Sequence, residues 1–96
     1  MYYVYILFSG KLGKKYIGFT SNLKKRMLYH NSGKSCYTCK GIPWKLVYYE
    51  VFRSEIDARK EEFFLKSGRG RERISFLLKD TLNSMERWQS GRMRQS

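Results

Sequence analysis

Arg26 and His30 lie four positions apart in a segment with helical spacing, so both project from the same side of the helix. They are interleaved with Leu23 and Met27, which places them beside the apolar stripe that faces a core. A guanidinium binds two phosphate oxygens at once, and an imidazole exchanges protons near neutral pH. This helix edge is therefore a candidate for handling a phosphate. The alternatives are that Arg26 is one more member of a basic run and that His30 has no role.

Glu62 is the acidic residue that we favour for chemistry. Hydrolysis of a phosphodiester needs a base that activates water, a cation beside the phosphate and stabilisation of the leaving oxygen. All eight acids lie after position 49, so a site with one metal ion and one carboxylate fits better than a cluster of carboxylates. Glu62 shares a helix face with Ala58 and Leu65, whereas Glu61 is predicted to be exposed. The alternative is a surface glutamate paired with Lys66 at i+4.

Tyr5 and Tyr16 belong to two predicted strands that a short turn joins. If Gly10 and Lys11 are the central residues of that turn, Tyr5 lies directly opposite Tyr16 on one face of the sheet, and a bulge at Gly13 would shift this register. Such tyrosines are more often core or sheet residues than bases. A tyrosine with a pKa near 10 is a poor base at neutral pH, so clustered cations would have to lower that value.

The apolar patterning predicts an α+β fold with the element order ββαβαα. The strands are expected at residues 2–8, 15–19 and 44–52, and the helices from a cap at Ser21 or Asn22 to about 31, at 55–67 and at 71–82. Apolar residues surround most of the second helix, which predicts burial on more than one side, and the glycines at 68–70 should break it. The strands should form a small three-stranded antiparallel sheet flanked by helices.

The chain has 96 residues, which suits a single domain. We expect the domain at residues 1–82 and a basic, disordered tail at 83–96, where no apolar periodicity remains. No apolar run reaches the length of a membrane-spanning helix. The first residues lack the features of a signal peptide, so we expect a cytoplasmic location.

The net charge is +12, and residues 1–49 hold nine Lys and Arg but no acid. Such a surface favours a nucleic acid as partner. No basic amphipathic helix with a broad apolar face points to a membrane. We expect the nucleic acid to contact six lysines: Lys14, Lys15, Lys24, Lys25, Lys34 and Lys66.

The two cysteines, Cys36 and Cys39, form a CxxC pair. A closed zinc site needs about four ligands, and His30 is the only other ligand of the usual type. A thioredoxin-like motif would need a strand before it and a helix after it, but this pair falls in a predicted loop. Plain reduced thiols are the favoured interpretation.

Five features in order carry a family resemblance. They are YVY at 3–5, YIG at 16–18, an arginine ten positions after the tyrosine of YIG, HNSGK at 30–34, and a glutamate within RKEEFFLKSGRGR at 59–71. Together they resemble the GIY-YIG nuclease superfamily. The resemblance is closest to its small, stand-alone bacterial members, which are similar to the N-terminal domain of the excision-repair nuclease. It covers residues 2 to about 80.

This resemblance implies a three-stranded antiparallel sheet between helices, one divalent ion (Mg²⁺ or Mn²⁺) and hydrolysis of nucleic acid. Carried over to this chain, Tyr5 and Tyr16 match the two motif tyrosines, with a slight preference for Tyr5 as the base. Arg26 matches the phosphate-binding arginine, His30 the position four beyond it, and Glu62 the metal ligand. A further asparagine that some members have after the glutamate helix has no counterpart that we can place.

We therefore expect a monomeric, metal-dependent endonuclease that acts on DNA, either single-stranded or of a particular branched structure. The alternative is a nucleic-acid-binding module of the same fold that is not catalytic or that needs a protein partner for activity. An RNA-binding sheet of the RRM kind is not favoured, because its RNP1 pattern of aromatic, basic and glycine residues is absent.

Overall fold

The computed structural model describes residues 1–35 and 37–81, so Cys36 and the predicted tail at 83–96 lie outside the described residues. The elements are β1 (Tyr2–Ser9), β2 (Lys14–Thr20), α1 (Leu23–Asn31), a short 3-10 helix (Cys39–Gly41), β3 (Trp44–Phe52), α2 (Glu55–Leu65) and α3 (Gly68–Leu77). The predicted order ββαβαα is confirmed. None of the described helices is long and apolar enough to cross a membrane.

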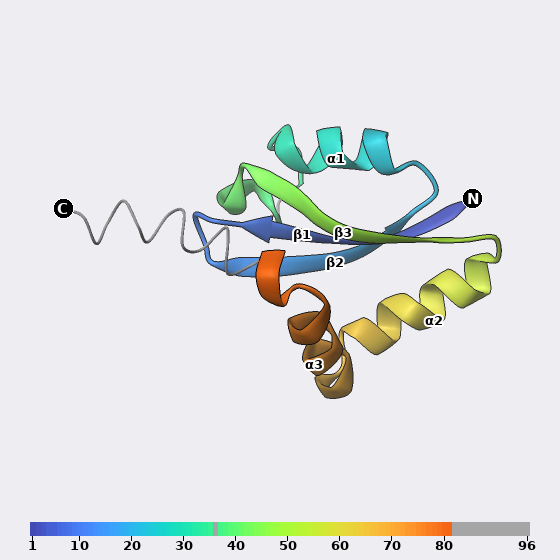
Figure 1. The fold of residues 1–96 in the computed structure, drawn as a ribbon. Coiled ribbons are helices and arrows are strands. Elements are labelled where there is room, and N and C mark those ends of the chain that lie inside the picture. The colour runs from blue at the N-terminus through green and yellow to red at the C-terminus, as the bar shows by residue number, and fades with distance from the viewer. Residues whose placement is uncertain (36, 82–96) are drawn as a thin grey trace.

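The three strands form one antiparallel sheet in the order β2-β1-β3. The central strand β1 is an unbroken aromatic and aliphatic run, and its residues 4–9 are all buried. Figure 1 shows the reason: α1 lies on one face of the sheet, whereas α2 and α3 lie on the other. A strand covered on both faces needs apolar side chains in both directions, which the alternation of a half-exposed strand would not supply.

The sheet separates two hydrophobic clusters. On the side of α2 and α3, the buried residues are Val4, Ile6, Ala58, Leu65, Ile74 and Leu78. On the side of α1, Tyr5, Leu7 and Trp44 pack with the partly buried Tyr16, Leu23, Met27 and Ile42. Successive residues of β1 therefore serve the two clusters alternately. Tyr5 points toward α1 for this reason.

The β1–β2 register differs from the predicted one by two residues. Tyr5 pairs with Gly18, and Leu7 pairs with Tyr16. The turn is longer than two residues because Gly13 adopts a positive φ of 66° and donates its N–H to the Ser9 carbonyl at 2.7 Å. A shift of two residues keeps every side chain on its face, so the rings of Tyr5 and Tyr16 remain neighbours, with centroids 6.4 Å apart.

Helix α2 begins at residue 55, as predicted, and the Ser54 side chain caps it by accepting the N–H of Asp57. It ends at Leu65 rather than at residue 67. The predicted burial on more than one side is wrong: Ala58 and Leu65 are buried, but Ile56 is 66% exposed and Phe63 is 80% exposed. The sheet and α3 cover a single face of the helix, and no described element covers the opposite one.

The glycines at 68–70 begin a helix instead of only ending one. Ser67 is the N-cap of α3, and its hydroxyl accepts the N–H of Gly70 at 3.2 Å. Helix α3 therefore spans Gly68–Leu77 rather than residues 71–82. Ile74 and Leu78 of this segment are buried, Leu77 is partly buried, and Leu82 lies outside the described residues.

Candidate active site

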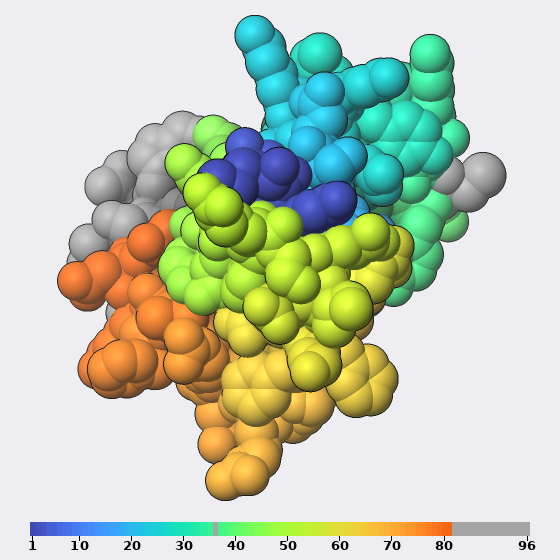
Figure 2. Space-filling model, turned by 90° about the vertical axis from the view of Figure 1, so that its right-hand side faces the viewer, coloured from blue at the N-terminus to red at the C-terminus, as the bar shows by residue number. Residues whose placement is uncertain are grey.

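A cavity of about 380 Å³ lies along the edge strand β2, where side chains from both faces of the sheet meet. Four of the five predicted catalytic residues line it: Tyr5, Tyr16, Arg26 and Glu62. They come from β1, β2, α1 and α2 respectively. Figure 2 shows α1 in cyan and α2 in yellow on either side of the strands. The edge of a three-stranded sheet is the place where two helices on opposite faces can contribute to one site.

Tyr5 reaches this cavity because the facing residue of β2 is a glycine. Tyr5 is 1% exposed, and its partner in the ladder is Gly18. A Cβ built on Gly18 would collide with the hydroxyl and the ring of Tyr5. The glycine of the YIG motif is thus a packing requirement, since it lets a phenol from the central strand extend over the edge strand.

His30 lies beneath the cavity rather than in its wall. It is 2% exposed, its Nε2 is 2.9 Å from the Tyr5 hydroxyl, and its Nδ1 is 3.0 Å from Thr38 Oγ1. Burial, together with the charge of Arg26, lowers the pKa of His30 below its ordinary value. The imidazole is therefore neutral at pH 7, with both ring nitrogens engaged.

Thr38 is a site residue that sequence analysis missed. It is 1% exposed and belongs to the loop after α1, where no periodicity marks buried positions. Two bonds from Trp44 hold this loop: its Nε1 donates to the Thr38 carbonyl at 2.7 Å, and its backbone N–H donates to the Asn31 side chain at 2.7 Å. Asn31, within HNSGK, also donates to the Trp44 carbonyl at 3.1 Å. The loop is thereby tied to the start of β3.

The Tyr5 phenol is neutral in this structure. Burial raises the pKa of Tyr5 above its ordinary value, and Tyr16 and Glu62 raise it further, whereas Arg26 lowers it through its charge and a hydrogen bond. The positive charge near Tyr5 is too small to offset the rise in its pKa that burial causes. A proton acceptor in contact with the phenol, such as His30, is the other way to make it a base.

Glu62 lies on α2 with its side chain 21% exposed, and its Oε2 is 3.0 Å from the ammonium of Lys66. The i+4 ion pair of the alternative interpretation is therefore present, although the carboxylate also lines the cavity. One carboxylate, completed by water and a substrate phosphate, is a ligand set that fits one Mg²⁺ or Mn²⁺ ion. Magnesium keeps several water ligands and binds through one or two carboxylates plus substrate phosphate. Within residues 1–35 and 37–81, no three His, Cys, Asp or Glu gather around a point.

The model of the GIY-YIG catalytic domain matches residues 1–74. The chain belongs to the GIY-YIG family. The two tyrosine motifs, the arginine helix and the glutamate helix all fall within the matched part, so the family resemblance predicted from sequence is confirmed.

Proteins similar to this chain include small bacterial UPF0213 proteins. The UPF0213 protein in the ldhD 5' region of Pediococcus acidilactici is 38% identical over 79 residues, which is 79% of this chain and 80% of the relative. A UPF0213 protein of Clostridium perfringens is 43% identical over 67 residues, 69% of this chain and 71% of the relative. The solution NMR structure of a UPF0213 protein from Bacillus halodurans is 37% identical, with a TM-score of 0.51 over 80% of this chain and 85% of that one. The predicted fold class is thus confirmed.

Arg59 is a charged residue of the cavity that sequence analysis missed. It lines the cavity beside Glu62, and its guanidinium carbon lies 4.4 Å from the centroid of the Phe19 ring. Its Nε also donates to Glu55 at 3.0 Å. Arg59 precedes Glu62 by three positions, and this i, i+3 spacing on one helix face was the available signal.

Glu61 differs from its predicted character as an exposed neighbour of Glu62. It is half-buried, and it does not line the cavity. Burial, followed by a hydrogen bond to Glu50 and the charge of that residue, raises the pKa of Glu61 to about 7, with Arg73 opposing. Glu50 in turn accepts a hydrogen bond from Tyr48 at 2.9 Å. Glu61 is therefore a poor control for substitutions of Glu62.

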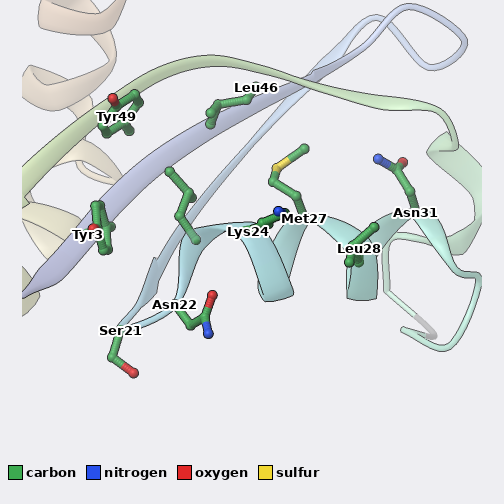
Figure 3. Close-up of a pocket in the computed structure, with 10 residues that line it drawn as sticks. Tyr3, Ser21, Asn22, Lys24, Met27, Leu28, Asn31, Leu46 and Tyr49 are labelled. Carbon is green, nitrogen blue, oxygen red and sulfur yellow. The ribbon is translucent and has the colours of Figure 1, made fainter.

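The six lysines predicted to contact nucleic acid are all exposed but do not share one surface. Lys14, Lys15 and Lys66 line a groove of about 970 Å³ next to the cavity. Lys24 lines a different groove of about 760 Å³, which lies between α1 and the strands β1 and β3 (Figure 3). Lys25 and Lys34 line none of these three hollows.

Proposed function

We propose that this chain is a metal-dependent endonuclease that hydrolyses phosphodiester bonds of nucleic acid, with DNA as the expected substrate. The observation that carries the proposal is the position of the Tyr5 hydroxyl. It reaches a polar cavity, contacts neutral His30 at 2.9 Å on its inner side, and faces Arg26. A proton acceptor and a phosphate-binding cation are thus available at one point.

Tyr5 and His30 would act together as the base. The Tyr5 oxygen takes a proton from the attacking water while its own proton moves to His30 Nε2. This transfer requires the tautomer with the proton on Nδ1, in which Nδ1–H donates to Thr38 Oγ1 and Nε2 accepts from the Tyr5 hydroxyl. The contact with Thr38 is compatible with this tautomer, because a threonine hydroxyl accepts as well as donates.

Arg26 and Arg59 would bind the phosphate. A guanidinium remains charged at every working pH and donates two parallel hydrogen bonds to phosphate oxygens. The two arginines come from α1 and α2, so they approach the cavity from helices on opposite faces of the sheet. Charge that develops on the phosphate oxygens would meet donors that are already in place.

Glu62 would hold the divalent ion, which supplies Lewis-acid stabilisation of the leaving oxygen when it is bound. Glu62 must then give up its bond to Lys66. That ion pair is exposed on the lysine side, and such pairs contribute about 1 kcal/mol or less. Lys66 is thereby free to contact a phosphate of the substrate.

Single-turnover cleavage of labelled single-stranded, duplex, flap and branched DNA, with Mg²⁺, Mn²⁺ or EDTA, tests this function. Glu62→Gln should abolish cleavage but retain binding or tighten it, because the surface is basic. Glu72→Gln is the matched control: it removes the same charge from an exposed position on α3 outside the cavity and should cut normally. Cleavage by Glu62→Gln at the wild-type rate would contradict the assignment of Glu62.

The second candidate function is a nucleic-acid-binding module that does not cut, or that cuts only with a partner. The ion pair between Lys66 and Glu62 favours it, because the carboxylate is already neutralised by a cation of the chain. This function takes precedence if the wild-type chain binds DNA but cuts none of the substrates with either metal.

A further inference from the structure

The groove of about 970 Å³ that contains Lys14, Lys15 and Lys66 continues from the catalytic cavity, because Tyr16 lines both hollows. A fourth cation, Arg71 of α3, completes its lining. The lining includes no acidic residue. Its cations come from β2, from the end of α2 and from α3, so they are spread along the groove rather than gathered at one point.

Tyr37 is the more exposed of the two aromatic side chains that line this groove. It is 82% exposed, and the centroid of its ring lies 5.7 Å from that of Tyr16 at an angle of 56°. The next residue, Thr38, is buried and bonded to both His30 and Trp44. The phenol ring of Tyr37 is therefore presented to solvent next to a residue that the core holds in place, which limits the ordering that binding requires.

We infer that this groove binds an unpaired nucleotide of the substrate, next to the phosphate held in the catalytic cavity. Its base would stack on Tyr37, and its flanking phosphates would contact the lysines and Arg71. An aromatic platform among cations is the arrangement by which proteins hold single strands, and it tolerates any base. A base inside a duplex has both faces covered by its neighbours, so it cannot stack on Tyr37.

The position of this nucleotide next to a scissile phosphate rests on the proposed function, whereas binding of the nucleotide in the groove does not. The inference deepens that function by selecting single-stranded or unpaired nucleic acid over duplex. It also separates two contributions to affinity. The cations recognise any polyanion, whereas Tyr37 recognises only one that carries free bases.

The test measures binding without divalent metal, by fluorescence anisotropy of a short labelled oligothymidylate and of the same chain made wholly abasic. Tyr37→Ala should weaken binding of the oligothymidylate about 5- to 100-fold, the range expected for loss of one stacked base. Tyr37→Phe and Tyr37→Trp should restore it. The abasic chain should bind wild type and Tyr37→Ala equally.

Phe76→Ala is the matched control, since Phe76 is also 82% exposed but does not line the groove; it should bind as wild type does. If Tyr37→Ala weakened binding of the oligothymidylate and of the abasic chain equally, the inference would be overturned. Equal weakening of binding to duplex DNA, or to heparin, a polyanion without bases, would overturn it as well. The titrations contain no divalent metal, so they do not depend on cleavage. Failure of the Tyr37 result with cleavage intact therefore refutes only the groove, and lack of cleavage with the Tyr37 result intact refutes only the enzyme.

Discussion

The phenol of Tyr5 lies over Gly18, its partner on the neighbouring strand, and fills the space where any other side chain would begin. This contact joins the two tyrosine motifs of the family in physical terms. One motif supplies a hydroxyl from the central strand, and the other supplies the gap through which the hydroxyl reaches the edge of the sheet.

Gly18→Ala should displace the Tyr5 hydroxyl from His30 and abolish cleavage. Overpacking of a filled site destabilises a protein by about 1–3 kcal/mol, so the melting temperature should also fall. In a Tyr5→Ala background the same substitution should cause little further loss, because the colliding ring is gone. Gly68→Ala is the control, since a Cβ there meets nothing within 4 Å. Unchanged cleavage by Gly18→Ala would show that Tyr5 has another path to the cavity.

The pH dependence of cleavage should report His30. Because the pKa of His30 is lowered from 6.5, the base stays unprotonated at neutral pH, and the rate should fall only as the pH drops below that value. His30→Ala should slow cleavage about 10²- to 10⁴-fold, the usual contribution of general base catalysis, and should remove the acid limb of the profile. A profile unchanged in His30→Ala would exclude the relay from Tyr5.

Thr38 should act as a positioning residue in the same relay. Thr38→Val removes the hydroxyl that accepts from His30 Nδ1–H in the tautomer that the relay requires, so it should lower kcat and shift the acid limb, with KM little changed. Thr38→Ser keeps the hydroxyl and should restore both. Rate–pH profiles of the two variants measure this. If Thr38→Val lowered only the melting temperature, the role of Thr38 would be structural.

Nucleic-acid binding should weaken steeply with salt, because bound cations release counterions from the phosphates. Lys15→Gln and Arg71→Gln remove charges that line the groove, and each should reduce the slope of log affinity against log salt by about 1. Lys60→Gln, an exposed lysine of α2 outside the described hollows, should leave the slope unchanged. A flat plot for wild type would argue against a phosphate-binding surface.

The Glu61–Glu50 pair should make stability depend on pH. The pKa of Glu61 rises from its ordinary 4.5 to about 7 in the folded chain, so the folded state binds this proton more tightly than the unfolded state does. Its contribution to stability is complete below pH 4.5 and is lost as the pH rises toward 7 and beyond.

Melting temperatures of wild type and Glu61→Gln between pH 5 and pH 8 measure this contribution. Wild type should lose stability relative to the variant as the pH rises. His30 gives both proteins the opposite pH dependence, which cancels in the difference between their melting temperatures. Glu72 is exposed, so the melting temperature of Glu72→Gln should follow that of wild type across this pH range. Parallel curves for Glu61→Gln would show that the carboxyl pair does not share a proton.

The order of the elements and the residues at the site could be predicted from the sequence because both depend on local patterns. The run at residues 44–52 became β3 with the same bounds. Asn22 caps α1 as one of the two predicted candidates. Tyr5, Tyr16, Arg26 and Glu62 were selected by type and spacing, and the fold brings them to one cavity. Their catalytic roles remain proposals.

The tertiary structure alone decided which side chains meet. The hairpin register depended on the conformation of Gly13, and the exposure of Phe63 depended on the lack of a described element beside it. Thr38 beneath His30 and Glu50 beside Glu61 are contacts between residues of different segments. The apolar period, together with caps and turn residues, marks each helix and strand locally, whereas strand register and contacts between segments are set only when whole elements pack.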